Sequence, residues 1–222
     1  AWIYCKKFLI REEKILIMAM ESEDMNQITS AIIQIITDCL ITKDVKVESL
    51  ATFDMEYLFL NIRAKSVGET VEVNVTCPDD GETQVQMEID IDSIKVQKDE
   101  AHTDLITISD ELSIKMRYPG IEFFAEGLKV DSIADSSNTV AKCVSSIVMG
   151  EEVYTVADMA EGELEEWLDA LSTSDYTKIL EFFRTMPKLT HTIKLKNRST
   201  GNNFEVVRNT YNFVPPAPET SS

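Results

Sequence analysis

Hydrophobic positions at helical spacing dominate the first forty residues of the chain. Residues 15–20 form an apolar run beside the charged segment 11–14. A second set follows at steps of three and four: Ile28, Ile32, Ile35, Ile36, Cys39 and Leu40. Such steps place side chains on one stripe of an α-helix. The polar segment 22–24 separates the two patterns, so the sequence predicts a helical hairpin. Because a hairpin cannot bury its apolar face alone, we expect the rest of the chain to supply a surface for it.

A third helix is predicted from Thr52, a residue type that favours the N-cap position. Its apolar residues recur at helical spacing: Met55, Leu58, Phe59 and Ile62. We expect this helix to end near Gly68, since glycine readily adopts the positive φ that closes many helices.

The period then changes to two, which is typical of strands with one buried face. Apolar residues alternate with polar ones on both sides of the turn 78–81: Val71, Val73, Val75 and Cys77, then Val85, Met87, Ile89 and Ile91. This pattern predicts a β-hairpin. Residues 95–104 are predicted as a loop, and residues 105–108 are expected to pair with residues 112–118.

Helical patterns return in the second half of the chain. Asp131 is predicted to cap a helix that ends at Gly150, with this apolar set: Ile133, Val140, Val144, Ile147 and Val148. Residues 151–160 are expected to form a connector. Two more helices are predicted, one over residues 164–171 and one from Ser174 to Pro187. A strand over residues 189–195, a turn over 197–203 and a strand over 204–207 complete the pattern.

Strands that gather in sequence, instead of alternating with helices, favour an α+β fold over a doubly wound sheet. We expect four regions: N-terminal helices (1–68), an antiparallel β region (69–127), C-terminal helices with a terminal hairpin (128–214) and a disordered tail (215–222). No segment reaches the roughly 18–20 apolar residues that a membrane span needs.

The chain has 222 residues, 44% of them hydrophobic, and a formal net charge of −18. It is long enough to bury a sizeable core. Its negative charge repels phosphate backbones, so nucleic acid is not expected as a partner. The charge has two interpretations: it maintains solubility, or it matches a basic partner in a larger assembly.

Four cysteines lie far apart in sequence, at Cys5, Cys39, Cys77 and Cys143. Buried, reduced thiols are expected at Cys39 and Cys143, and they favour synthesis in a reducing cytoplasm. Cys77 precedes a tight turn, where a zinc knuckle places its first ligand pair, but acidic residues and Gly81 occupy the place of a second cysteine. We therefore expect no metal. A site built from Cys77, His191 and carboxylates is the alternative.

Catalytic signals are sparse. The chain has two histidines, His102 in a polar loop and His191 in a predicted strand. His191 lies in step with the apolar residues of that strand, so a role in the core or at the sheet edge is favoured over that of a ligand or base. Neither a glycine-rich phosphate loop nor a GxSxG or HExxH motif is present. The alternating Glu88, Asp90 and Asp92 lack the spacing of a calcium loop, so we interpret them as the solvent-exposed face of the strand. The sequence predicts neither an enzyme nor a cofactor.

Three segments together carry a resemblance to a known family. They are FLIREEKILIMAME (8–21), FDMEYLFLNIRAKSVGE (53–69) and the shorter EFFRTMPKL (181–189). The chain resembles the baseplate hub family of T-even-type contractile-tail phages from Phe8 to Phe213. The chain has no cysteine partner near Cys77 and none in the turn 197–203. If relatives hold these turns with metal, this chain must use packing and turn hydrogen bonds instead.

The resemblance implies a structural or assembly subunit of the tail baseplate hub, made in the host cytoplasm and located in the virion. Its partners would be other tail or baseplate proteins in a larger symmetric assembly, and no catalytic residue is implied. Two alternatives remain open: an assembly chaperone that is absent from the mature virion, and a baseplate-associated cell-wall hydrolase.

Tyr211, Phe213 and Val214 are the predicted partner interface, because they place two aromatic rings beside the predicted disordered tail. The alternative is that these aromatic residues close the local core.

Overall fold

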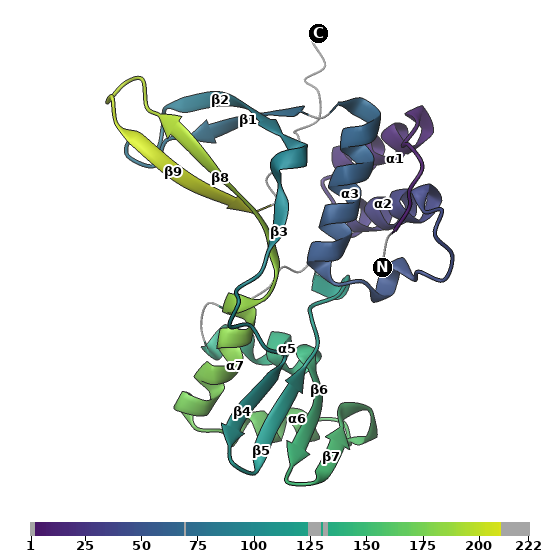
Figure 1. The fold of residues 1–222 in the computed structure, drawn as a ribbon, viewed down its shortest axis with the longest axis vertical. Helices are drawn as coiled ribbons and strands as arrows, with labels where there is room; N and C mark the ends of the chain where they lie inside the picture. Colours follow the sequence, from purple (N-terminus) through teal and green to yellow (C-terminus); the bar gives the residue numbers. More distant parts are fainter. Residues whose placement is uncertain (1–2, 69, 124–129, 131–132, 210–222) are drawn as a thin grey trace. The chain divides into compact units, whose positions relative to one another are not determined.

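The structure, a computed structural model, describes residues 3–68, 70–123, 130 and 133–209. The chain forms two compact units. Ala1–Gln97 and Lys188–Ser222 make the first, here called the N/C unit, and Lys98–Pro187 make the second, the inserted unit. Helices and small antiparallel sheets together confirm the α+β fold class (Figure 1). No helix among the described residues is long and apolar enough to cross a membrane.

The N/C unit begins with the predicted helical hairpin, formed by α1 (Ile10–Glu21) and α2 (Met25–Cys39). At the start of α1, the Glu12 carboxylate accepts the Leu9 backbone N–H at 2.9 Å. Asp24 caps α2 by accepting the Asn26 backbone N–H at 2.9 Å. Both bonds satisfy donors that the first turn of a helix leaves free. The hairpin buries almost completely a set of side chains from both helices: Leu16, Ile35, Ile36 and Cys39.

Helix α3 (Thr52–Val67) follows a short 3-10 turn, η1 (Val47–Ser49). The N-cap is Ala51, one residue before the predicted Thr52, whose side chain is buried. The helix ends at Gly68 as predicted, with a positive φ of 146°.

Two hairpins, both predicted, complete the N/C unit. One pairs β1 (Thr70–Thr76) with β2 (Gln84–Asp90), and the other pairs β8 (Lys188–Lys196) with β9 (Asn203–Asn209). A short 3-10 turn, η2 (Ile91–Ser93), leads from β2 to β3 (Lys95–Gln97). Helix α3 and the strands share one core: Leu60, Ala64, Val75, Cys77, Ile89, Ile91, Ile94, Leu189, Ile193 and Leu195.

The predicted loop over residues 95–104 is wrong in its first three residues. Strand β3 pairs with β8, and Val96 lies opposite Leu189. The partner strand lies almost a hundred residues further along the chain, so no local pattern shows the pairing.

The inserted unit is a four-stranded antiparallel sheet covered by helices. Its strands lie in the order β4 (Leu105–Ser109), β5 (Leu112–Met116), β6 (Val144–Met149) and β7 (Glu152–Thr155), which confirms the predicted β4–β5 pairing. Helices α5 (Ile133–Cys143), α6 (Glu163–Asp169) and α7 (Thr173–Thr185) pack on the sheet, and η3 (Val156–Asp158) follows β7 (Figure 1). The core joins both layers: Ile106, Ile114, Ile147, Val140, Leu164, Leu168, Ile179, Phe182 and Phe183.

The predicted helix up to Gly150 is wrong beyond Cys143, where the chain turns into β6. The predicted connector over 151–160 likewise contains β7 and η3. Val144, Ile147 and Val148 lie at steps that suit one face of a helix, but β-branched residues also favour strands. Here β6 lies between β5 and β7, so pairing on both sides decides in favour of the strand.

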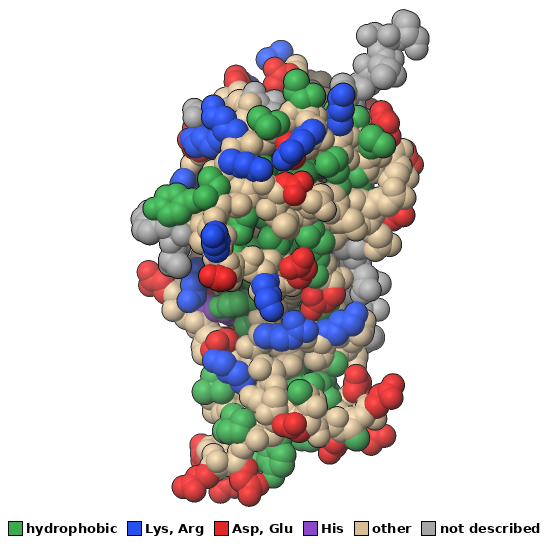
Figure 2. All heavy atoms as spheres, turned by 90° about the vertical axis from the view of Figure 1, so that its right-hand side faces the viewer, with side chains coloured by type: hydrophobic (Ala, Val, Ile, Leu, Met, Phe, Trp, Pro, Cys, Tyr) green, Lys and Arg blue, Asp and Glu red, His purple; other side chains and the backbone are tan. Residues whose placement is uncertain are grey.

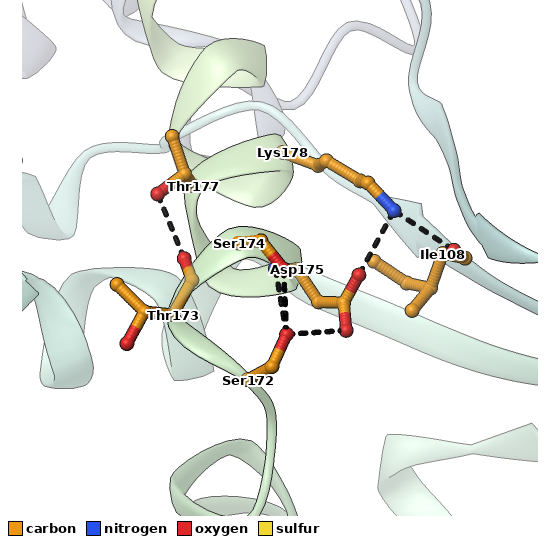
Figure 3. A network of polar contacts seen from close by, with 7 residues as sticks. All are labelled: Ile108, Ser172, Thr173, Ser174, Asp175, Thr177 and Lys178. Atoms are coloured by element: carbon orange, nitrogen blue, oxygen red, sulfur yellow. Dashed lines mark hydrogen bonds and ion pairs between the residues drawn. The ribbon is translucent and has the colours of Figure 1, made fainter.

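Helix α7 begins at Thr173, one residue before the predicted Ser174 (Figure 3). Ser172 is the N-cap, and its hydroxyl oxygen accepts the Asp175 backbone N–H at 3.2 Å. The Lys178 ammonium donates to Asp175 Oδ1 at 2.8 Å and to the backbone carbonyl of Ile108 at 2.9 Å. The hydrogen bond from Lys178 thus links the first turns of α7 to strand β4.

Candidate assembly site

The predicted interface residues Tyr211, Phe213 and Val214 lie outside the described residues, as does the predicted tail 215–222. Strand β9, which precedes them, is described up to Asn209. Their role at an interface or in the local core therefore stays a prediction.

Two turns of the N/C unit are joined by polar side chains. Asn197, which is fully buried, donates from Nδ2 to Asp79 Oδ1 at 2.7 Å and to Asp80 Oδ2 at 2.9 Å. Its Oδ1 accepts the backbone N–H groups of Ser199 and Thr200 at 2.7 and 3.3 Å. One side chain thus connects the β1–β2 turn with the β8–β9 turn. We call the whole set the hairpin clasp: Asp79, Asp80, Thr83, Asn197, Ser199, Thr200 and Asn202.

Further donors surround the two carboxylates of the hairpin clasp. Asp79 Oδ2 accepts from Thr200 Oγ1 at 2.5 Å and from Asn202 Nδ2 at 3.2 Å. Asp80 Oδ2 accepts from Thr83 Oγ1 at 2.5 Å. Desolvation raises the pKa of Asp79, but the bonds from Thr200, Asn197 and Asn202 outweigh it, so the pKa lies below its usual range. Hydrogen bonds from Thr83 and Asn197 also hold the pKa of Asp80 well below its usual range.

Cys77 lies buried at the base of the first turn, where its carbonyl accepts the Gly81 N–H at 3.0 Å. Desolvation raises the pKa of its thiol, and the charges of Asp79 and Asp80 add to the effect. A thiol with a raised pKa stays protonated, whereas zinc binds the thiolate. No group of three His, Cys, Asp or Glu side chains in the described ranges is arranged to hold a metal. Hydrogen bonds between the turns join the two hairpins.

The partners of Asp79 and Asp80 were not predicted from the sequence. A signal was present, because the turn 197–203 is rich in Asn, Ser and Thr, whose side chains donate to carboxylates.

Two of the other three cysteines are buried, whereas Cys5 is partly exposed. Cys39 and Cys143 are fully buried and free, as predicted. Burial raises the pKa of Cys143 to about 12.

His102 anchors a loop of the inserted unit. Its Nδ1 lies 2.9 Å from Thr185 Oγ1 and its Nε2 lies 3.1 Å from the Tyr118 hydroxyl. The ring also lies 5.2 Å from the ring of Phe182, centroid to centroid. Desolvation lowers the pKa of His102, and the charge of Lys98 lowers it further. His191 is half-buried on β8, in register with Arg208.

We predict that acidification below neutral pH destabilises the inserted unit through His102. In the unfolded chain, His102 takes up a proton near pH 6.5, whereas in the folded protein its pKa is lower. The stabilisation by the neutral imidazole is therefore complete above pH 6.5 and is lost as the pH falls below this value. Urea midpoints at pH 7.5 and 5.5 measure the loss, which should be smaller for His102→Gln than for the unchanged protein. The opposite order would contradict the prediction.

A groove of about 590 Å³ lies between the N-terminal segment and α3 in the N/C unit. Its walls are mostly apolar, and three lysines contribute to its lining: Ile3, Cys5, Leu50, Tyr57, Leu58 and Ile62, with Lys6, Lys7 and Lys65. Asp54 and Asn61 also line it, and desolvation raises the pKa of Asp54.

Large apolar side chains are exposed around the helical hairpin. Ile10 and Met18 on α1 are 76% and 69% exposed, and they lie eight residues apart, on one face of the helix. Four more exposed apolar side chains flank these helices. Tyr4 and Leu9 precede α1, Met25 begins α2 and Ile41 follows α2. Figure 2 shows hydrophobic side chains interspersed with Lys and Arg on a face of the molecule. A patch of this kind marks a surface suited to protein contacts.

These features define an acidic α+β protein whose polar side chains join its own hairpins and whose helical hairpin leaves apolar side chains at the surface. The family model described as T4 bacteriophage base plate protein matches residues 2–213. The chain therefore belongs to this family, and it is a baseplate protein of T4-type phages, located in the tail baseplate of the virion. Searches of curated proteins and of solved structures returned no match.

Proposed function

We propose that the chain is a structural subunit of the baseplate hub, made in the host cytoplasm, that acts through contacts with other tail proteins. The exposed apolar face of α1 carries this proposal. Ile10 and Met18 are mostly exposed in the described part of the chain, and leaving such side chains in water forgoes the free energy that burial against a partner would give. The family match supports the baseplate part of the proposal.

Contacts, not catalysis, are the proposed mode of action. Both ring nitrogens of His102 bond to neighbours, and the carboxylates of Asp79 and Asp80 accept hydrogen bonds within the hairpin clasp. These groups hold the fold together. Release of fragments from purified peptidoglycan by the isolated protein would contradict this part and favour a cell-wall hydrolase.

Quantitative mass spectrometry of purified virions tests whether the chain is a retained subunit. We expect a fixed stoichiometric ratio to known baseplate components in assembled tails, together with cross-links to proteins of the central hub. Presence in infected cells but absence from virions would favour an assembly chaperone. Cross-links only to proteins outside the hub would contradict the hub assignment.

The double substitution Ile10→Lys and Met18→Lys is expected to reduce incorporation into tails at least about tenfold, because a lysine at each position places an uncompensated charge in a buried contact. The melting temperature should change little, since both side chains are exposed. The matched control is Asn74→Lys with Gln84→Lys, which adds the same charge at exposed strand positions of the same unit. Equal incorporation of the two variants would contradict the proposed face.

A further inference from the structure

Strand β7 forms one edge of the four-stranded sheet in the inserted unit. It pairs with β6 from Met149↔Glu152 to Ser146↔Thr155, and no strand in the described part of the chain pairs with its other side. All four of its residues are exposed. Every edge strand directs half of its backbone N–H and C=O groups outward, where they are free to pair with another chain.

The opposite edge of the same sheet is protected. Strand β4 has an irregular register between Thr107 and Ser109, and the Lys178 ammonium binds the carbonyl of Ile108 within that irregularity (Figure 3). Bulges and lysines are the usual means by which proteins prevent edge-to-edge pairing. Strand β7, by contrast, keeps a continuous register with β6 and contains neither Lys nor Pro.

Apolar side chains are exposed on β7 and at the adjoining end of β6. Val153 is 62% exposed, Met149 50% and Tyr154 44%. Val153 and Tyr154 are neighbours in sequence and therefore point to opposite faces of the sheet. An incoming strand would thus find an apolar contact on each face. The Tyr154 hydroxyl donates to the Glu152 carboxylate, which fixes the position of that acid at the edge and raises the pKa of Tyr154.

The segment of the chain that contains β7 carries negative charges only. Residues 143–177 contain nine Asp and Glu and no Lys or Arg, and residues 98–187 contain 19 acidic against 7 basic residues, a net charge of −12. Figure 2 shows acidic side chains gathered around the lower hairpins of the inserted unit. Because like charges repel, a second copy of this acidic strand is disfavoured at the edge. A basic strand is favoured there.

We propose that β7 is a docking edge to which a baseplate partner adds an extended segment with alternating basic and apolar residues, as a fifth strand of the sheet. Backbone hydrogen bonds to the free edge would supply affinity, and the exposed apolar side chains with the surrounding carboxylates would select the segment. This inference rests on the proposed function, because it names the kind of partner that one surface of the subunit takes.

The test uses the full chain and a ten-residue peptide of alternating Lys and Val. A matched peptide carries the same sequence and charge but is N-methylated at alternate residues, so that it cannot donate to a strand edge. We expect the unmodified peptide to bind at least about tenfold more tightly, with an affinity that falls as salt is raised. Hydrogen exchange should show new protection of backbone amides within Glu152–Thr155.

Charge reversal locates the effect. Glu151→Lys with Glu152→Lys is expected to weaken peptide binding about tenfold, whereas Glu21→Lys with Glu23→Lys, an equal charge change at exposed positions of the N/C unit, should leave it within about twofold. Equal binding of both peptides, or hydrogen-exchange protection elsewhere than in β7, would overturn the proposal. The proposal would also be overturned if this chain formed a concentration-dependent dimer whose β7 backbone amides are protected from exchange. Any of these results leaves the virion measurement unaffected, so failure at this edge is distinguishable from failure of the hub assignment.

Discussion

Replacing Phe182 with alanine is expected to lower the free energy of unfolding of the inserted unit by about 3–5 kcal/mol. The side chain is 1% exposed and lies at the centre of the core under the sheet. Its ring centroid lies 5.6 Å from that of Tyr118 and 5.1 Å from that of Phe183. Its removal leaves a cavity and also withdraws the ring on which His102 packs.

Urea unfolding followed by the fluorescence of Trp167 measures this loss, because Trp167 packs against the same core. A Trp2→Phe background leaves Trp167 as the reporter. Leu105→Ala is the control: Leu105 is 43% exposed, so its truncation should cost less than about 1 kcal/mol. A loss below about 1 kcal/mol for Phe182→Ala would show that this core does not hold the unit together.

The substitution Asn197→Asp is expected to destabilise the N/C unit by about 3–5 kcal/mol at pH 7. The change keeps the shape of the side chain but replaces a donor with an acceptor. Asn197 Nδ2 lies within 3 Å of carboxylate oxygens from Asp79 and Asp80, so a third carboxylate there would face two like charges in a buried position. The loss should shrink as the pH is lowered from 7 to 5, because the new carboxyl group then gains a proton that it can donate.

Equilibrium unfolding in the presence of a chelator measures the effect and keeps stray cations away from the new carboxylate cluster. Asn203→Asp makes the same chemical change one residue beyond the hairpin clasp, at an exposed position, and should cost less than about 1 kcal/mol. If the two variants were equally stable, the hairpin clasp would contribute no more than a solvated turn.

The candidate sites differ in how far the sequence revealed them. At Cys77, the sequence indicated that a lone cysteine followed by acidic residues cannot complete a zinc site, which leaves packing and hydrogen bonds to hold the turn. It did not reveal the partner, because Asn197 lies 118 residues away from Asp79. The β7 edge was missed altogether. The segment 152–155 contains three residues that favour strands, but it is only four residues long, and its strand conformation depends on pairing with β6.

The sequence by itself determined the elements whose periodicity is long and uninterrupted. The helical hairpin α1–α2, helix α3 up to Gly68 and the β1–β2 hairpin follow from local rules, because spacing, caps and turn residues act within a few positions. Only the tertiary structure decided that β3 joins β8, that Val144–Met149 is a strand and that two distant turns share a buried asparagine. These choices depend on which distant segments meet. The free energy of such contacts is gained only once the chain has closed on itself, and no short stretch of sequence contains it.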